Sequence, residues 1–427
     1  MAKQRKNRFN RPIYKWTLGL GMAIAAGIFG AEYWGMHKFY NMHINEGGRA
    51  QVGLWTGTEK QENQIIEPYV WSIYNHKRNQ VRNGIKYTNS QGYIGEEIPE
   101  IKPENEIWIL SRGGSTTEGH HIRKVESKWP NRIGTILTPY NGYKVRGLNG
   151  GLIAADSATL AHLYIGKDQF LDIDALIICS GANDVRVLGS PDYVRDYSTY
   201  RKPGKYEEPR LGEPTLLKIS NFAKGIYVLW LKDKFVTIED FPNISRIDPK
   251  EFYNNIEERD SAGFRENIRS ISLAAQGRGQ KVILIPDMTN PDKQEVVNIG
   301  GEWGNHIDSL YLGVEKHKEI MKALAKEHGF HYLELDPKRF KGMFTDWCHL
   351  NEEGTELRSM ITSEYIRRNV LEGIITERKS EQEKLSQAHQ KTLENSLNPN
   401  YETPKDKTLQ QIHEKHQTTA TPQDEIQ

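Results

Sequence analysis

Short apolar stretches recur along the middle of the chain, separated by longer segments with helical spacing. The apolar stretches are residues 107–110, 175–179, 279–286 and 331–335, and the helical spacing is clearest at residues 264–276 and 310–328. Short apolar runs of this length are typical of buried strands. Strands that alternate with helices predict an α/β fold, in which helices cover both faces of a mainly parallel sheet.

The first 35 residues combine a basic segment with an uncharged one. Six Lys and Arg residues precede Trp16, and no acidic residue occurs before Glu32. We interpret residues 13–35 as a transmembrane anchor and residues 1–12 as its cytoplasmic tail, which predicts that the rest of the chain lies outside the cytoplasmic membrane. A cleaved signal peptide and a buried core helix remain as alternatives.

The rest of the chain divides by composition. Residues 36–104 are a polar, Tyr-rich connector, interpreted as a stalk that packs on the following domain, and residues 105–375 carry the predicted strands and helices. Residues 200–248 are an insertion whose apolar side chains fall on one side of a helix; it packs on the domain, or acts as a lid or membrane-surface helix. Residues 376–427 are rich in Gln, Glu, Lys and Thr, which predicts a frayed helix and a disordered tail.

Charge and cysteine content limit the classes of function that the sequence allows. The net charge is +1, and the basic residues are dispersed among acids except at the N-terminus, which argues against a nucleic-acid partner. Cys179 and Cys348 are the two cysteines; a bond between them is an alternative to the favoured pair of buried thiols. No metal site is predicted, because the adjacent His120 and His121 lack the spacing of a ligand pair. No cofactor is predicted either.

Three residues from two distant parts of the sequence have the chemistry of a serine esterase. Ser115 follows an apolar strand and the pair Gly113-Gly114, which let the backbone turn and expose a hydroxyl at the strand's carboxyl end. His349 is the candidate base. Asp346 precedes it by three residues, so its carboxylate can fix the tautomer of the histidine ring. Each element alone has an ordinary alternative as a turn, a helix cap or a surface histidine.

A fourth element supplies donors for a developing negative charge. Asn183 follows the strand at 175–179, and its side-chain amide can donate to an oxyanion. Backbone N–H groups would complete such a hole. The alternative is an ordinary turn after a buried strand.

The order and identity of these blocks resemble those of the SGNH (GDSL-like) hydrolase family. The resemblance covers about residues 107–371 and rests on Gly114-Ser115, Gly181-Ala182-Asn183-Asp184, and Asp346 with His349. It implies a three-layer α/β/α fold, a catalytic triad of Ser115, Asp346 and His349, and an oxyanion hole formed by Ser115, Asn183 and a residue of a further block that starts at Asn149. In that block Ala154 stands where the family has glycine.

The resemblance also implies an activity. We expect a membrane-anchored serine esterase that forms an acyl-enzyme on an acyl ester of an extracytoplasmic glycan, with O-acetyl as the favoured group, because the Gly-Gly-Ser variant resembles anchored relatives that modify surface polymers. The expected partners are an acylated glycan or lipid substrate, the membrane, and proteins of a surface-polymer assembly system. Acyl transfer to a sugar hydroxyl and a non-catalytic assembly role remain as alternatives.

Overall fold

The computed structural model describes residues 66–68, 74–82, 84–198, 247–299 and 304–396, together with Gly27 and Gly30. The predicted cytoplasmic tail, nearly all of the predicted anchor, most of the insertion at 200–248 and the chain beyond residue 396 lie outside the described residues. Within the described part of the chain, no helix combines the length and the apolar character that a membrane crossing requires.

A five-stranded parallel sheet forms the centre of the first compact unit, residues 1–365. Its order is β6-β5-β7-β8-β9, and every neighbouring pair is parallel. The strands are β5 (Glu106–Gly113), β6 (Lys144–Gly151), β7 (Ala175–Ser180), β8 (Lys281–Pro286) and β9 (His331–Tyr332). The predicted parallel α/β fold is therefore confirmed.

The last strand is shorter than its apolar sequence predicted. The ladder of β9 ends at Tyr332, although the apolar run continues to Leu335. Leu333 still donates its N–H to the carbonyl of Leu284 at 3.0 Å, and Leu333 and Leu335 are buried. Leu333 and Leu335 are apolar because they pack in the interior, whereas Glu334 between them is exposed, and burial alone does not require a strand.

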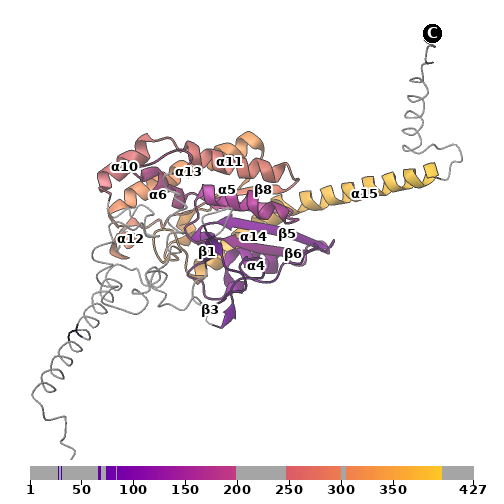
Figure 1. Cartoon of the computed structure of the whole chain (residues 1–427), viewed down its shortest axis with the longest axis horizontal. Coiled ribbons are helices and arrows are strands. Elements are labelled where there is room, and N and C mark those ends of the chain that lie inside the picture. The colour runs from indigo at the N-terminus through magenta and orange to yellow at the C-terminus, as the bar shows by residue number, and fades with distance from the viewer. Residues whose placement is uncertain are drawn as a thin grey trace, which may run out of the picture. The chain divides into compact units, whose positions relative to one another are not determined.

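Helices cover the sheet because each presents an apolar stripe to it. On one face lie α5 (Ser157–Gly166), α11 (Ala262–Gln276) and α13 (Ile307–His328) (Figure 1). Their side chains share a buried cluster with strand side chains such as Trp108 and Leu176. Two of these helices match the predicted segments at 264–276 and 310–328. Helix α4 (Trp129–Leu137) packs directly on β6: a Cβ on Gly134 would lie 2.9 Å from the backbone nitrogen of Gly147.

The remaining described strands and α-helices are short, apart from the last two helices. They are β1 (Ile66–Pro68), β2 (Tyr74–His76), β3 (Val81–Arg82), β4 (Ile85–Lys86), α3 (Ser115–Glu118), α6 (Ala182–Gly189), α10 (Pro249–Glu258), α12 (Lys293–Ile299), α14 (Glu352–Asn369) and α15 (Leu371–Ser396). Residues 366–427 form a second unit, in which α15 is mostly exposed after Ile375.

Connector residues between 74 and 98 contribute to the core of the first unit. Tyr74, Tyr93 and Ile98 are buried in the same cluster as the sheet. The hydroxyl of Tyr93 donates to Asp168 at 2.6 Å, and Asp168 is also paired with the buried guanidinium of Arg112 on β5. This part of the connector is therefore held by buried polar contacts as well as by apolar packing.

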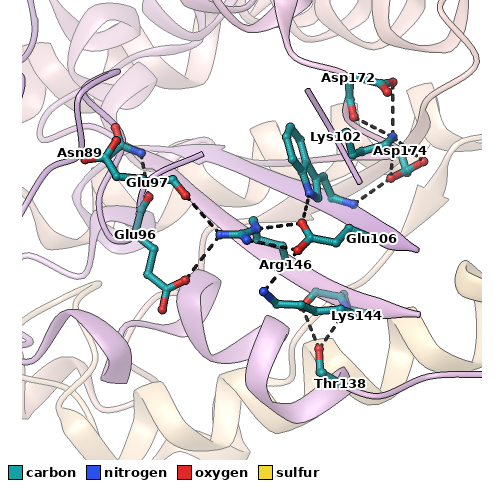
Figure 2. A network of polar contacts seen from close by, with 12 residues as sticks. Asn89, Glu96, Glu97, Lys102, Glu106, Thr138, Lys144, Arg146, Asp172 and Asp174 are labelled. Carbon is teal, nitrogen blue, oxygen red and sulfur yellow. Dashed lines mark hydrogen bonds and ion pairs between the residues drawn. The ribbon is translucent and has the colours of Figure 1, made fainter. Parts of the chain in front are cut away.

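A polar network fastens the same connector to the amino ends of β5 and β6 (Figure 2). Arg146 donates to both carboxylate oxygens of Glu106 at 3.1 and 3.2 Å, and also reaches Glu96 and the carbonyl of Glu97. Burial raises the pKa of Glu106, but hydrogen bonds from Arg146, Trp108 and Lys144 outweigh it and lower the pKa to about 2. This network lies at the amino ends of β5 and β6, whereas the residues described next lie at the carboxyl ends of the strands.

Candidate active site

The nucleophile block lies where the strand order reverses. β6 is placed on one side of β5 and β7 on the other, so the carboxyl ends of β5 and β7 flank a topological switch point, where open α/β sheets bind their ligands. β5 ends at Gly113, and α3 begins at Ser115. The N–H of Ser115 is in the first helical turn, where a backbone donor has no partner within the helix.

Gly113 and Gly114 are needed because neighbouring atoms lie too close to them for a side chain to fit. A Cβ on Gly113 would lie 2.2 Å from the hydroxyl of Thr117 and 2.4 Å from the carbonyl of Cys179, and one on Gly114 would lie 2.4 Å from Asn183 Nδ2. Gly114 has φ −79°, a value that other residues adopt freely. Both glycines therefore leave room for neighbouring atoms, Gly113 for the adjacent strand and Gly114 for Asn183.

The structure brings Ser115, His349 and Asp346 into one hydrogen-bonded chain. Ser115 Oγ lies 2.7 Å from His349 Nε2, and His349 Nδ1 lies 2.6 Å from Asp346 Oδ2. With Nδ1 protonated toward the carboxylate, Nε2 has a free lone pair directed at the serine hydroxyl. The three side chains thus have the nucleophile, base and acid arrangement of a serine hydrolase.

Asp346 is held in place by its own loop. Its second oxygen, Oδ1, accepts the backbone N–H groups of Cys348 and His349 at 2.9 and 2.8 Å. Burial raises the pKa of Asp346, but the hydrogen bond and charge of His349 and the two backbone donors outweigh it, so the pKa lies below its usual value. The carboxylate therefore stays ionised, as stabilisation of a transient imidazolium requires.

Asn183 lies beside the nucleophile on the first turn of α6. Its Nδ2 donates to the carbonyl of Ala155 at 3.0 Å, which fixes the orientation of the amide. An amide nitrogen carries two hydrogens, so one donor remains for another acceptor. The structure therefore places Asn183, the N–H of Ser115 and the segment containing Ala154 around the same strand ends.

Ala154 adopts the left-handed conformation, with φ +55°. This backbone region favours glycine, and an L-residue there costs roughly 1–2 kcal/mol. A glycine adds only about 0.4–1 kcal/mol of unfolded-chain entropy. We expect Ala154→Gly to raise the free energy of unfolding by about 0.5–1 kcal/mol in urea titrations. Ala323→Gly, at an exposed position inside α13, is the control and should lower it by about 0.5–1 kcal/mol; a loss of stability in both variants would contradict the strain at Ala154.

Two side chains that the sequence did not single out support these segments. Asp287, just after β8, accepts the hydroxyl of Thr116 at 2.8 Å and the N–H of Ala182 at 3.0 Å, so it joins the Ser115 segment to the Asn183 segment. His317 on α13 lies 2.8 Å from the carbonyl of Gly181, the residue before α6. Asp287 had a detectable signal, since it follows a buried strand at the same edge; His317 had none, because it occupies an ordinary helix position.

His317 predicts a loss of stability in acid. Burial lowers its pKa to about 4 from 6.5, and its Nε2 has no hydrogen-bond partner among the described residues. Because the unfolded chain takes up this proton first, the free energy of unfolding should fall by up to about 3 kcal/mol as the pH drops from 6.5 to 4. Denaturant titrations at several pH values should show a shallower slope for His317→Gln. The exposed His389→Gln is the control, and an unchanged slope in His317→Gln would contradict the assignment.

Cys179 and Cys348 are both buried free thiols. Cys179 contacts Asp287 at 3.3 Å and accepts from Arg358 at 2.9 Å, and burial raises its pKa to about 11. Burial also raises the pKa of Cys348 well above its ordinary value. Both thiols are thus protonated packing groups, and the alternative of a bond between them is not what the structure shows.

The adjacent histidines of the sequence have different neighbours. The ring of His121 packs edge-on against the ring of His349 with centroids 4.8 Å apart, and its Nε2 is 4.0 Å from Asp346 Oδ2. His120 lies near the buried carboxylate of Glu118 instead, at 3.9 Å. His121 is therefore a neighbour of the hydrogen-bonded chain, a position that its spacing in the sequence did not reveal.

No protein-family model and no curated protein matches this sequence. Comparison with solved structures finds a putative lipolytic protein of the G-D-S-L family from Desulfitobacterium hafniense, with 13% identity, a TM-score of 0.33, and coverage of 60% of this chain and 98% of the other. It also finds an acetylxylan esterase from Geobacillus stearothermophilus (13%, TM-score 0.36, 64% and 98%) and a putative acylhydrolase from Bacteroides fragilis (14%, TM-score 0.35, 63% and 90%). The chain is thus similar to proteins with these descriptions, and its chemistry is inferred below from its own side chains.

Proposed function

We propose that this protein is a serine ester hydrolase in which Ser115 forms an acyl-enzyme. The observation that carries the proposal is the continuous chain from Ser115 Oγ through both nitrogens of His349 to Asp346, at 2.7 and 2.6 Å. A serine hydroxyl is a weak nucleophile unless a base lies beside it, and here the base is in hydrogen-bond contact and its tautomer is fixed.

The geometry supports a two-step reaction. Ser115 Oγ attacks the acyl carbon as its proton passes to His349 Nε2, and the carbonyl oxygen becomes an oxyanion. The N–H groups of Ser115 and Ala154 and the free Nδ2 hydrogen of Asn183 donate to it. The imidazolium then protonates the leaving alcohol. A water molecule, deprotonated by His349, releases the acid and restores Ser115.

The proposed substrate and compartment rest on the sequence. We propose an acyl ester, with O-acetyl favoured, on an extracytoplasmic glycan, and an uncleaved N-terminal anchor that holds the enzyme at the membrane surface. The support is the run of six basic residues before an uncharged segment, together with the Gly-Gly-Ser form of the nucleophile block.

The decisive test uses the full chain purified in detergent. A chromogenic acetyl ester should be hydrolysed, and a serine-directed phosphonate should label Ser115 and stop turnover. If the phosphonate labelled Ser115 but the ester were not hydrolysed, the proposed activity would be acyl transfer to an acceptor alcohol instead of hydrolysis. Absence of both would leave a non-catalytic protein with this fold and would overturn the proposal.

The anchor makes a separate prediction about topology. In intact cells, added protease should digest the part of the chain that contains Ser115 and leave the N-terminal tail protected. Deleting residues 1–35 should leave turnover of a small ester unchanged and reduce deacylation of surface glycan in cells. If the Ser115 region were protected until the membrane is disrupted, the compartment and the glycan substrate would have to be abandoned, while the esterase chemistry would stand.

A further inference from the structure

His121 completes a group of three donors for a metal ion. His121, Asp346 and His349 each offer one ligand atom, and these atoms all lie within 4.8 Å of one another. His121 Nε2 is 4.0 Å from Asp346 Oδ2, and His349 Nδ1 is 2.6 Å from the same oxygen. The donors come from two segments more than two hundred residues apart, which the fold brings to the same strand ends.

The separations suit a small divalent ion after modest shifts. Zinc–ligand bonds of about 2.0–2.2 Å in a tetrahedral site place neighbouring donors roughly 3.3 Å apart. Reaching that value moves the His121 donor about 0.7 Å closer to Asp346 and the His349 donor about 0.7 Å away from it. It also brings the donors of the two histidines up to about 1.5 Å closer to each other. His121 can move because its side chain is 42% exposed.

The rest of the site is already organised for a ligand role. Asp346 keeps its position through Oδ1, which accepts two backbone N–H groups, so Oδ2 is presented by a rigid loop. Fixing a ligand through its other atoms in this way raises metal affinity. Two imidazoles and one carboxylate are also the donors of open three-ligand zinc sites, in which water takes the fourth position.

We propose that Zn²⁺ binds reversibly to His121, Asp346 and His349 and switches the serine site off. A metal on His349 Nδ1 uses that nitrogen's lone pair, so the single proton of the neutral ring moves to Nε2. Nε2 then donates to Ser115 Oγ and has no lone pair to accept the serine proton. The metal also takes Asp346 Oδ2 away from the imidazole. The inhibition rests on the proposed serine chemistry, whereas the binding does not.

The test measures binding and inhibition separately on the untagged full chain in detergent. Calorimetric titration with ZnCl₂ should show one site of micromolar affinity in the unsubstituted protein and in Ser115→Ala, which lacks turnover but retains all three ligands. His121→Phe keeps the ring contact with His349 and loses the nitrogen donors, and it should bind at least tenfold more weakly. His120→Phe is the matched control and should bind as the unsubstituted protein does.

Inhibition of acetyl-ester turnover is then read relative to each variant's own rate without metal. The half-inhibitory Zn²⁺ concentration should rise at least tenfold in His121→Phe and stay unchanged in His120→Phe. Equal Zn²⁺ affinity in the unsubstituted protein and in His121→Phe, or no site tighter than about 0.1 mM, would overturn the metal site. Binding to Ser115→Ala with no esterase activity in any variant would overturn the proposed function and leave the metal site standing.

Discussion

Ser115→Ala should lose acetyl-ester hydrolysis by about 10⁴–10⁶-fold in kcat and should no longer be labelled by a serine-directed phosphonate. The substitution removes Ser115 Oγ, which lies 2.7 Å from His349 Nε2. This is the atom that would attack the ester, so no acyl-enzyme can form. The fold should remain, because the change deletes one oxygen at the start of a short helix, with an expected cost of about 1 kcal/mol.

The matched control for this experiment is Ser90→Ala. Ser90 donates its hydroxyl to Glu97 at 2.6 Å in the connector, so its loss removes a serine hydrogen bond without touching the strand ends. Turnover should stay within about twofold of the unsubstituted protein, which is the size of effect expected of a surface substitution. His349→Ala should be about as damaging as Ser115→Ala, and Asp346→Asn somewhat less, because residues that act as one unit do not contribute additively. Near-normal hydrolysis by Ser115→Ala would remove the basis of the assignment.

Asn183→Ala should lower kcat by roughly 10²–10³-fold with little change in KM, as expected for the loss of one oxyanion donor. The donor matters most when negative charge has developed, so the effect falls on the chemical step. The variant also loses the bond to the carbonyl of Ala155, which should cost about 1 kcal/mol of stability.

Asn255→Ala separates the two contributions of Asn183. Asn255 on α10 donates its amide to the carbonyl of Gly189 at 3.0 Å, which is the same kind of bond at the same distance. It should therefore lose a similar amount of stability in urea titrations while kcat is unchanged. If Asn183→Ala kept its kcat and lost only stability, Asn183 would be a structural turn residue, and the oxyanion hole would have to be built from backbone donors alone.

The sequence alone was enough to predict the parallel α/β arrangement. It was also enough to select Ser115, His349 and Asp346, which the structure joins by hydrogen bonds. The strands β5, β7 and β8 have near-continuous apolar sequences, because a sheet covered on both faces buries the side chains on both sides of its strands. Ser115 comes two residues after the end of β5, and Asn183 comes three residues after the end of β7. Asp346 and His349 are three residues apart, so local geometry alone could join them.

Contacts between segments distant in sequence were decided only by the tertiary structure. Asp287 joins the segments of Ser115 and Asn183, His317 holds the carbonyl before α6, and His121 reaches Asp346, yet none of these residues has a spacing that reveals its partner. The same holds for Gly114, whose missing side chain makes room for the amide of Asn183.

The physical reason is the range over which each pattern acts. Apolar periodicity records which face of an element is buried, and that is a property of neighbouring residues in the chain. A side chain's polar partner depends on strand order and on how helices pack, which only the whole fold fixes. The left-handed backbone of Ala154 also depends on the whole fold, because such strain persists only where surrounding contacts determine the conformation.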